Sequence, residues 1–475
     1  MKSVRRKQAA CCCLAVCCGA LPPAFANDWK VTPTVSVGAT LSDNINLSPD
    51  KEGDLVLTIS PGVSVRKETG RLRLNADYSF QNVISFSDSD RNNSFHQLSA
   101  GASAEVWADR LFVDARASIS QANISPFGLI GLDNTSNSDN RTTVKSFDIT
   151  GRYVQRFGSF ATGQARYTHG ESHYTDAFST RTNDAVSLNL DSGSRFNTVG
   201  WGLAYSHSNT DSETVDWSAE SVSGYLSFIY SPRLRFRLTG GYEDFNVPTT
   251  ANVPEGEFWS VGVDYAPGPL TTLNASFGRR FFGDTKSFSL TRKGRHSNWL
   301  VNYSENVVNE EVVLPILRAF VLTDLAGNPL PNPLTGQPFT FFRLERARFS
   351  ETFLTKGFDT SYSYDFGRSK LTLSAYDRER DSQLRALIIE ERGANGLWNW
   401  RVFPRTSADF GLGFQRANLK PLGREDKYIF LTVGATHKLS AKATATLTYR
   451  HQRRDSNMDP DYNENSLALF VNMRF

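Results

Sequence analysis

The chain has 475 residues, of which 52 are basic and 49 acidic, so its formal charge is only +3. Its mean hydropathy is below zero, and no stretch after residue 26 approaches the roughly 20 consecutive apolar residues that a membrane-spanning helix needs. These properties exclude a bundle of transmembrane helices, and the nearly balanced charge gives no electrostatic reason to expect a nucleic-acid partner.

The first 26 residues have the three regions of a cleaved signal peptide. Basic residues between positions 2 and 7 precede an apolar stretch from 9 to 21, and Ala24-Phe25-Ala26 provides the small residues of a cleavage site. All five cysteines lie in this segment, so the mature chain, 27–475, is expected to hold neither a disulfide nor a cysteine metal site. Lipidation of Cys17 is the alternative, but bulky Val16 stands where a small residue is needed.

The mature chain contains many segments in which apolar and polar residues alternate. The clearest are 70–80, 234–242 and 442–450, where leucine, phenylalanine and tyrosine occupy every second position and arginine, threonine and asparagine the positions between. This period of two predicts β-strands with one apolar and one polar face. A soluble β-sandwich gives the same alternation, so the connections must decide between the two architectures.

The connections alternate between short turns and long polar loops. Short ones such as Gly158-Ser159 and Pro404-Arg405-Thr406 contain turn residues, and long ones such as 82–93 and 121–142 are rich in Asn, Asp and Ser. Short periplasmic turns opposite long extracellular loops are typical of outer-membrane barrels. The predicted fold class is all-β, a transmembrane antiparallel up-and-down β-barrel of about 22 strands. Because the first strand, 30–41, begins almost at the cleavage site, we expect no N-terminal plug domain.

The end of the chain supports this location. The last strand has an apolar residue at every second position and ends on an aromatic residue. We interpret this pattern as a membrane-assembly signal, with the barrel assembly machinery and outer-membrane lipid as expected partners. Its residues are Leu467, Leu469, Val471, Met473 and Phe475. The sequence therefore predicts a protein of the bacterial outer membrane.

One predicted loop, 308–354, is much longer than the others. Its segment Val312–Leu322 is too apolar for a freely solvated loop, and several Asn-Pro and Gly-containing turns follow it. We expect this segment either to fold onto the mouth or into the lumen of the barrel, or to project outward as a hairpin packed on its neighbours.

The polar rows of the strands supply candidate lumen-lining residues with an excess of arginine. They are Arg71, Arg73, Asp77, Arg166, Arg235, Arg237, Glu243, Asp264, Arg279 and Arg450. Guanidinium groups could guide an anionic or hydroxyl-rich polymer through bidentate hydrogen bonds. Alternatively, opposite charges on adjacent strands pair across a hydrated lumen and only hold the barrel in shape.

The sequence offers little support for an enzyme. The segment His169-Gly170-Glu171-Ser172-His173 resembles a metal or acid–base cluster, but no third ligand or nucleophile is in register with it. The acidic runs 88–93 and 133–140 lack the spacing and glycine of a calcium-binding EF-hand loop. We therefore predict no catalytic residue, no metal and no cofactor.

Several stretches resemble the outer-membrane β-barrel family associated with exosortase/PEP-CTERM and exopolysaccharide gene clusters. The resemblance spans the mature chain and is stronger in its second half. The matching stretches are Arg279-Arg280-Phe281-Phe282-Gly283, Arg292 to Tyr303, Gly367-Arg368-Ser369, Tyr376-Asp377-Arg378-Glu379-Arg380, Ser456-Asn457 and Tyr462 to Phe475. The resemblance implies a place beside polysaccharide synthesis and export machinery, and it implies no catalytic residue.

These observations lead to one expected function and two alternatives. The expected function is a passive conduit for an exopolysaccharide across the outer membrane, with polysaccharide and periplasmic export proteins as partners. A general porin for small solutes is the alternative within transport. An outer-membrane scaffold or adhesin with a closed lumen is the alternative from another class.

Overall fold

The computed structural model describes residues 29–136, 138–175, 180–212, 216–246, 255–321, 340–383 and 386–475. The predicted signal peptide, 1–26, lies outside these residues. The described residues contain no helix that is both long and apolar enough to cross a membrane.

The described residues form 22 β-strands and two short 3-10 helices, η2 (Ser89–Arg91) and η3 (Lys420–Leu422). The strands are β1 (Lys30–Ser42), β2 (Asp54–Glu68), β3 (Leu72–Ser85), β4 (Asn93–Trp107), β5 (Leu111–Asn123), β6 (Arg141–Phe157), β7 (Ala161–Tyr174), β8 (Arg181–Ser192), β9 (Val199–Ser212), β10 (Trp217–Ser231) and β11 (Leu234–Asn246). They continue with β12 (Glu255–Gly268), β13 (Thr271–Arg280), β14 (Gly283–Lys293), β15 (Ser297–Val321), β16 (Thr340–Asp365), β17 (Ser369–Ser382), β18 (Ile388–Phe403), β19 (Thr406–Leu419), β20 (Arg424–Lys438), β21 (Ala443–Ser456) and β22 (Tyr462–Arg474).

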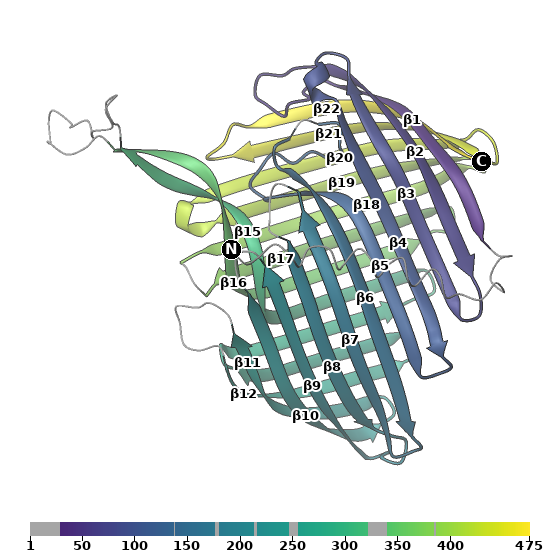
Figure 1. Cartoon of the computed structure of the whole chain (residues 1–475), viewed down its shortest axis with the longest axis vertical. Helices are drawn as coiled ribbons and strands as arrows, with labels where there is room; N and C mark the ends of the chain where they lie inside the picture. Colours follow the sequence, from purple (N-terminus) through teal and green to yellow (C-terminus); the bar gives the residue numbers. More distant parts are fainter. Residues whose placement is uncertain are drawn as a thin grey trace, which may run out of the picture.

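The strands form one closed antiparallel barrel (Figure 1). Each strand pairs with its neighbours in chain order, and β22 pairs with β1 over a ladder from Ser42↔Ser466 to Thr34↔Arg474, which closes the ring. The strand number is the predicted one. An even number of strands places both ends of the barrel chain at the same rim, which also carries the short turns.

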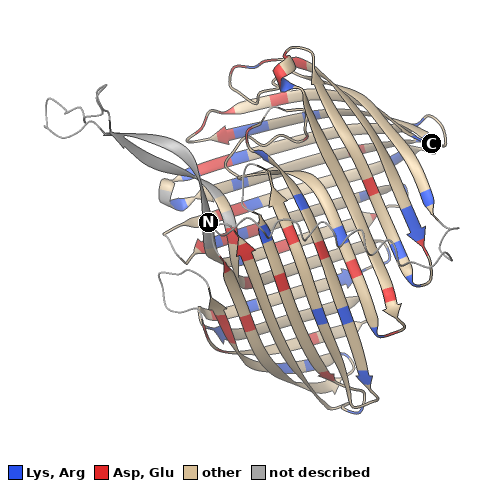
Figure 2. Cartoon of the chain, in the orientation of Figure 1, with Lys and Arg blue, Asp and Glu red and all other residues tan. Residues whose placement is uncertain are grey.

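The two faces of the wall differ as the alternation predicts. Leu447 and Leu469 lie directly opposite each other on β21 and β22, and their exposed fractions are 46% and 51%. The neighbouring row on the other face carries Thr446 opposite Phe470. Exposed apolar rows of this kind suit a hydrocarbon solvent and would be unusual over the whole surface of a soluble protein. Charged residues of both signs are interspersed over the barrel (Figure 2).

Closure depends on a small residue at the seam. A Cβ atom at Gly38 of β1 would lie 2.2 Å from the ring of Phe470, its partner on β22. The glycine therefore leaves room for an aromatic ring on the inner face at the junction of the first and last strands.

The strands β15 and β16 are longer than the rest. Their ladder runs from Ser297↔Tyr364 to Val321↔Thr340, well past Tyr303, where the ladder between β14 and β15 ends. Much of the predicted loop 308–354 is therefore strand, because its apolar and β-branched residues continue the pairing. The central residues, 322–339, lie outside the described part of the chain, so the two interpretations of this segment remain predictions.

We expect Gly38→Val to destabilise the barrel at its seam. The added side chain must displace the Phe470 ring, and overpacking of this kind typically costs about 1–3 kcal/mol. The measurement is the urea concentration at the midpoint of unfolding from lipid vesicles. Gly151→Val on β6 is the matched control, because nothing lies within 4 Å of a Cβ atom at that position. Equal midpoints for the two variants would contradict the proposed role of Gly38.

Candidate functional site

The connection between β5 and β6, residues 124–140, folds into the barrel, and we call it the inner loop. The Tyr428 hydroxyl donates to the carbonyl oxygen of Gly128 at 2.9 Å, and the Tyr462 hydroxyl donates to that of Ile130 at 3.2 Å. These tyrosines belong to β20 and β22, which β1 to β4 separate from β5 along the wall. The contact must therefore cross the interior.

The inner loop is closed on itself by side-chain hydrogen bonds. Asn140, which is fully buried, accepts from the Ser125 amide at 3.0 Å and donates to the Ser125 carbonyl at 2.8 Å. Further along, the Ser138 hydroxyl donates to the Leu129 carbonyl at 2.8 Å. These bonds make a compact loop with its ends close together, which can be held as a unit.

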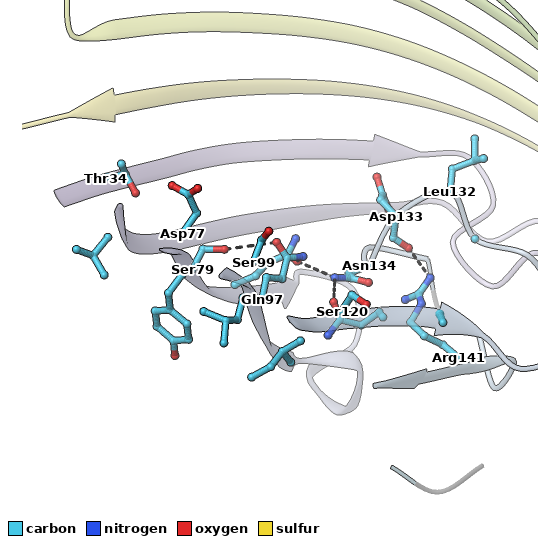
Figure 3. Close-up of a pocket in the computed structure, with 18 of the residues that line it drawn as sticks. Thr34, Asp77, Ser79, Gln97, Ser99, Ser120, Leu132, Asp133, Asn134 and Arg141 are labelled. Carbon is cyan, nitrogen blue, oxygen red and sulfur yellow. Dashed lines mark hydrogen bonds between the residues drawn. The ribbon is translucent and has the colours of Figure 1, made fainter. Parts of the chain in front are cut away.

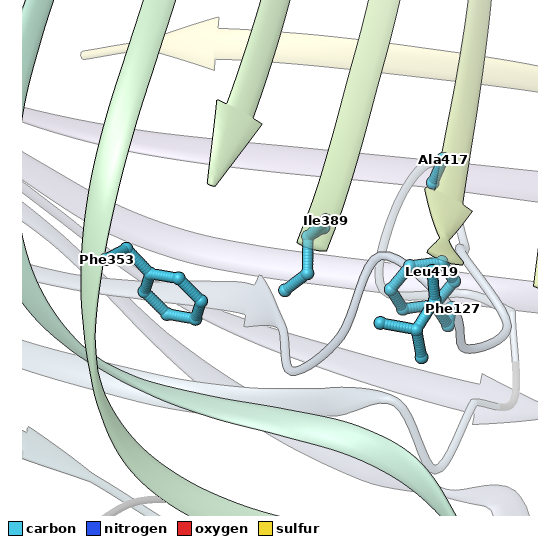
Figure 4. Packing of buried hydrophobic residues seen from close by; sticks show 5 residues of the cluster. All are labelled: Phe127, Phe353, Ile389, Ala417 and Leu419. Atoms are coloured by element: carbon cyan, nitrogen blue, oxygen red, sulfur yellow. The ribbon is translucent and has the colours of Figure 1, made fainter. Parts of the chain in front are cut away.

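An apolar anchor fixes the tip of the inner loop against the opposite wall. Phe127 is buried among Phe353 of β16, Ile389 of β18, and Ala417 and Leu419 of β19 (Figure 4). Burying an aromatic side chain of this size contributes about 2–3 kcal/mol. The ring therefore opposes withdrawal of the loop from the lumen.

A polar anchor lies beside the apolar one. The Arg424 guanidinium donates to the Phe127 carbonyl at 2.7 Å, and Arg454 approaches the same oxygen at 3.4 Å. Arg424 also pairs with Asp426 at 2.9 Å, and both arginines pair with Asp459, at 2.5 and 2.9 Å. Arg424, Asp426 and Arg454 are essentially inaccessible to solvent. Two guanidinium groups are shared between two carboxylates and a main-chain carbonyl, although the buried Nε atom of Arg454 has no hydrogen-bond partner among the described residues.

The polar anchor lowers the pKa of Asp459. Asp459 lies in the connection between β21 and β22. Burial raises the pKa of this carboxyl, but hydrogen bonds and charges from Arg454 and Arg424 outweigh burial, so the pKa lies below its usual value. The folded protein therefore favours the ionised carboxylate that the anchor requires.

A cavity of about 810 Å³ lies between the inner loop and the wall formed by β3, β4 and β5 (Figure 3). Its lining includes Asp77, Ser79, Ser99, Ser120 and Arg141 together with a chain of amides. In this chain the Asn134 side chain donates to Gln81 at 2.8 Å and to Gln121 at 3.1 Å, and Gln97 donates to Gln81 at 3.1 Å. Hydroxyl and amide groups of this kind offer donors and acceptors suited to a hydroxyl-rich ligand.

The inner loop identifies the inward rows of the wall. Arg450 on β21 pairs with Asp133 of the loop, so its row faces the lumen. Following the cross-strand register around the barrel, the same face carries Arg73, Asp77, Arg166, Arg235, Arg237, Glu243 and Asp264. Arg71 lies in the turn before β3. Their role in transport remains a prediction.

The structure places one predicted residue on the other row. Arg279 lies opposite Trp259, whose row faces outward, whereas its neighbour Arg280 points inward. Arg280 pairs with Glu243 at 2.7 Å, and Arg237 pairs with Asp264 at 3.1 Å. These pairs fit the interpretation that some inward charges hold the wall in shape.

The sequence analysis missed the anchors of the inner loop. Tyr428 and Arg454 lie in rows that predict only a polar lumen, and their partners in the inner loop are 300 and 327 residues away. A usable signal was present in the loop itself, where Pro126-Phe127-Gly128-Leu129-Ile130 interrupts an otherwise polar segment. An apolar stretch in a polar loop predicts a buried surface.

The segment His169–His173 lies on β7, and its two histidines form separate contacts. His169 contacts the Asp184 carboxylate at 2.9 Å through Nδ1, and His173 contacts the Thr180 hydroxyl at 2.9 Å. Within the described ranges, no group of three or more His, Cys, Asp and Glu side chains is arranged to hold a metal ion.

Comparison with known proteins gives a likeness in fold. No family model and no curated protein matches the chain. Among solved structures, the chain is similar to the FrpB iron transporter of Neisseria meningitidis (F3-3 variant), with a TM-score of 0.54 and 10% identity, over 94% of this chain and 81% of that chain. The F5-1 variant in its apoprotein form gives a TM-score of 0.52 and 10% identity, over 95% and 81%. A siderophore receptor, PirA of Pseudomonas aeruginosa, matches at 0.47 and 12%, over 94% and 80%.

The comparison corrects one clause of the predicted fold class, the absence of an N-terminal plug domain. The FrpB barrels that the chain resembles in fold are described as iron transporters, and 22-stranded outer-membrane transporters have a plugged lumen. A 22-strand barrel fold therefore does not support the prediction that a plug domain is absent. The physical reason is width, since a ring of 22 strands encloses more space than its own side chains fill. In this structure the inner loop occupies part of that space.

The barrel and its outer face also confirm the predicted location. A closed 22-strand barrel with exposed apolar outer rows is the architecture of outer-membrane proteins, and this protein is an outer-membrane β-barrel. The similar FrpB structures are described as iron transporters rather than as enzymes.

We expect Arg454→Met to loosen the inner loop. Removing one member of a buried charged network leaves Asp426 and Asp459 undercompensated, which typically costs about 3–5 kcal/mol. The measurement is chymotrypsin cleavage after Phe127, which is 3% exposed in the parent protein. Arg453→Met is the matched control. Arg453 is the preceding residue of β21, and its side chain faces outward and is 57% exposed. Faster cleavage in Arg454→Met alone is expected, and equal rates in both variants would exclude the anchor.

The polar anchor should also weaken in acid. Because the pKa of Asp459 is lower in the folded protein than in the unfolded chain, its stabilising contribution is complete above the unfolded pKa of about 4. That contribution is lost as the pH falls through the folded pKa. Hydrogen-exchange protection of the inner-loop amides should therefore decline below about pH 4. In Asp459→Asn this decline should be reduced, and an unchanged profile in the variant would assign the acid response to other groups.

Proposed function

We propose that the protein is a passive outer-membrane conduit for an exopolysaccharide, narrowed by the inner loop. The observation that carries the proposal is the polar cavity beside that loop, lined by serine hydroxyls and by the amides of Gln81, Gln97 and Asn134. Sugar hydroxyl groups both donate and accept hydrogen bonds, and so do these side chains.

A conduit requires many weak contacts rather than one strong one. A polymer held tightly at a single place does not move, whereas one that exchanges equivalent hydrogen bonds can slide. Serine faces the lumen at equivalent positions on successive strands, including Ser64, Ser99, Ser118 and Ser146, with Asp77 between the first two. This row supports a wall along which a hydroxyl-rich chain can pass.

The resemblance to barrels associated with exopolysaccharide gene clusters supports the same polymer class. The barrel itself contains no described feature that would supply energy, so synthesis or periplasmic partners would drive transport. The named iron transporters and siderophore receptors share only the fold with this chain at 10–12% identity. Their cargo is therefore not part of the proposal.

A general porin for small solutes is the second candidate. The same polar rows and interspersed charges favour it, because they would also admit hydrated solutes (Figure 2). The two functions differ in whether a chain of sugars occupies the lumen for longer than a single sugar does.

The test is the conductance of the refolded mature protein, 27–475, in a planar bilayer with added maltohexaose or glucose. We expect a steady conductance that maltohexaose interrupts for longer than glucose at equal mass concentration, because the longer chain makes more simultaneous contacts. Interruptions of equal length would favour the porin.

Two further outcomes complete the test. If the parent protein is silent and Arg454→Met conducts, the inner loop is the barrier within a conduit. If both are silent, the lumen is closed, and the scaffold or adhesin function replaces the conduit. Deletion of the gene in the native bacterium should lower secreted polymer, and unchanged secretion would contradict export.

A further inference from the structure

A second cavity lies on the inward face at the rim that carries the short turns. It has a volume of about 520 Å³ and is formed by β10, β11, β12 and β13. The charged residues that line it are Arg233, Arg235, Arg237 and Asp264, so arginines outnumber carboxylates by three to one. The cavity lies away from the inner loop, since the loop contacts the wall from β16 to β22.

The guanidinium of Arg237 is held in a fixed position. Its Nη2 atom donates to Asp264 at 3.1 Å, and the group lies over the ring of Tyr225 at 5.0 Å from the centroid. The Tyr225 hydroxyl in turn donates to Asp191 at 2.7 Å, which fixes the ring. A cation placed against an aromatic face and a carboxylate loses little freedom when it binds a further group.

Arg237 has hydrogen-bonding capacity left over. Its Nε atom is buried and has no hydrogen-bond partner among the described residues. The Arg237 side chain as a whole is 41% exposed, so the rest of its guanidinium is open to an acceptor that enters the cavity.

Arg235 adds a second guanidinium on the same strand. It lies directly opposite Asp264 on β12, but the ion pair that Asp264 forms in the described structure is with Arg237. One carboxylate therefore faces two inward arginines on adjacent positions of a single row. The other carboxylate beside this cluster, Asp191 of β8, accepts from the Tyr225 hydroxyl and does not line the cavity.

We propose that Arg235 and Arg237 form a subsite for the carboxylate group of an acidic sugar. Asp264 and Tyr225 position Arg237, and Asn274 and Thr272 of β13, which also line the cavity, face the hydroxyl groups of the same sugar. Guanidinium groups match the planar carboxylate with paired hydrogen bonds. This inference rests on the proposed conduit function and names its substrate class, a polymer that contains uronic acid. At the short-turn rim the subsite meets the chain as it enters from the periplasm.

The test is calorimetric binding to the mature protein in lipid nanodiscs. The probes are trigalacturonate, neutral maltotriose and inorganic phosphate. We expect trigalacturonate to bind at least about tenfold more tightly than maltotriose, as one or two charge-assisted hydrogen bonds predict. The double variant Arg235→Gln/Arg237→Gln should lose this preference while its binding of maltotriose stays the same. Arg235→Lys should lose part of it, because the charge remains without the fork of donors.

Arg156→Gln is the matched control, an inward arginine beside the turn between β6 and β7 that does not line this cavity. Its preference should equal that of the parent protein. Folding of each variant is checked by its heat-dependent migration in electrophoresis, and Arg235→Lys keeps the test decisive if the double variant does not fold.

Three results would overturn the subsite. They are equal binding of trigalacturonate and maltotriose by the parent protein, a preference that survives in the double variant, and phosphate binding as tight as that of trigalacturonate with the same dependence on both arginines. The last result would leave a simple anion site without a sugar. Binding does not require an open lumen. A barrel that is silent both as the parent protein and as Arg454→Met, but prefers trigalacturonate, refutes the conduit and keeps the subsite. A conducting barrel without the preference does the reverse.

Discussion

The structure depends on the requirement that every backbone amide and carbonyl in hydrocarbon has a partner within the protein. A sheet meets this requirement only by closing, and here closure is the pairing of β1 with β22. Once the ring is closed, alternate side chains must face lipid or lumen, which explains why half of each strand is apolar although the whole chain is hydrophilic. The glycine at position 38 and the ring of Phe470 show that the seam is also shaped by packing on the inner face.

Closure of this many strands creates a second constraint, because a wide ring leaves an interior that its own side chains do not fill. The inner loop fills part of this interior. Its Phe127 side chain packs in an apolar cluster, and the Phe127 carbonyl oxygen accepts from two buried guanidinium groups. The buried ions are stable there because each has several partners, and they are sensitive to the loss of any one. A loop held in this way leaves the lumen only when both anchors break. We therefore expect it to be either fully anchored or released, with no stable position between.

Local periodicity was sufficient for the strands, their number and the inward direction of most polar rows. It failed where the answer depends on distant residues. The partners of Phe127 are separated from it by 297 and 327 residues, and no pattern of period two contains that information. It also failed at Arg279 and Arg280, because two adjacent arginines at the end of a short strand leave the parity undecided until the register against Trp259 is known. The length of β15 and β16 was missed as well, because 308–354 was predicted as one long loop, whereas the pairing continues to Val321 and Thr340.

The two polar cavities lie at different places in the barrel and differ in the side chains that line them. The one beside the inner loop is built mainly from hydroxyls and amides, whereas the one at the short-turn rim has an excess of arginine. Charge acts over a longer range than hydrogen bonding, so the arginine cavity is suited to drawing in an acidic chain, and the amide cavity to contacts that exchange one at a time. The arginines that hold the inner loop, Arg424 and Arg454, are buried in ion pairs and do not line the amide cavity. In the proposed conduit, capture at the entrance and weak contacts beside the inner loop would let an acidic chain pass without being held at one place.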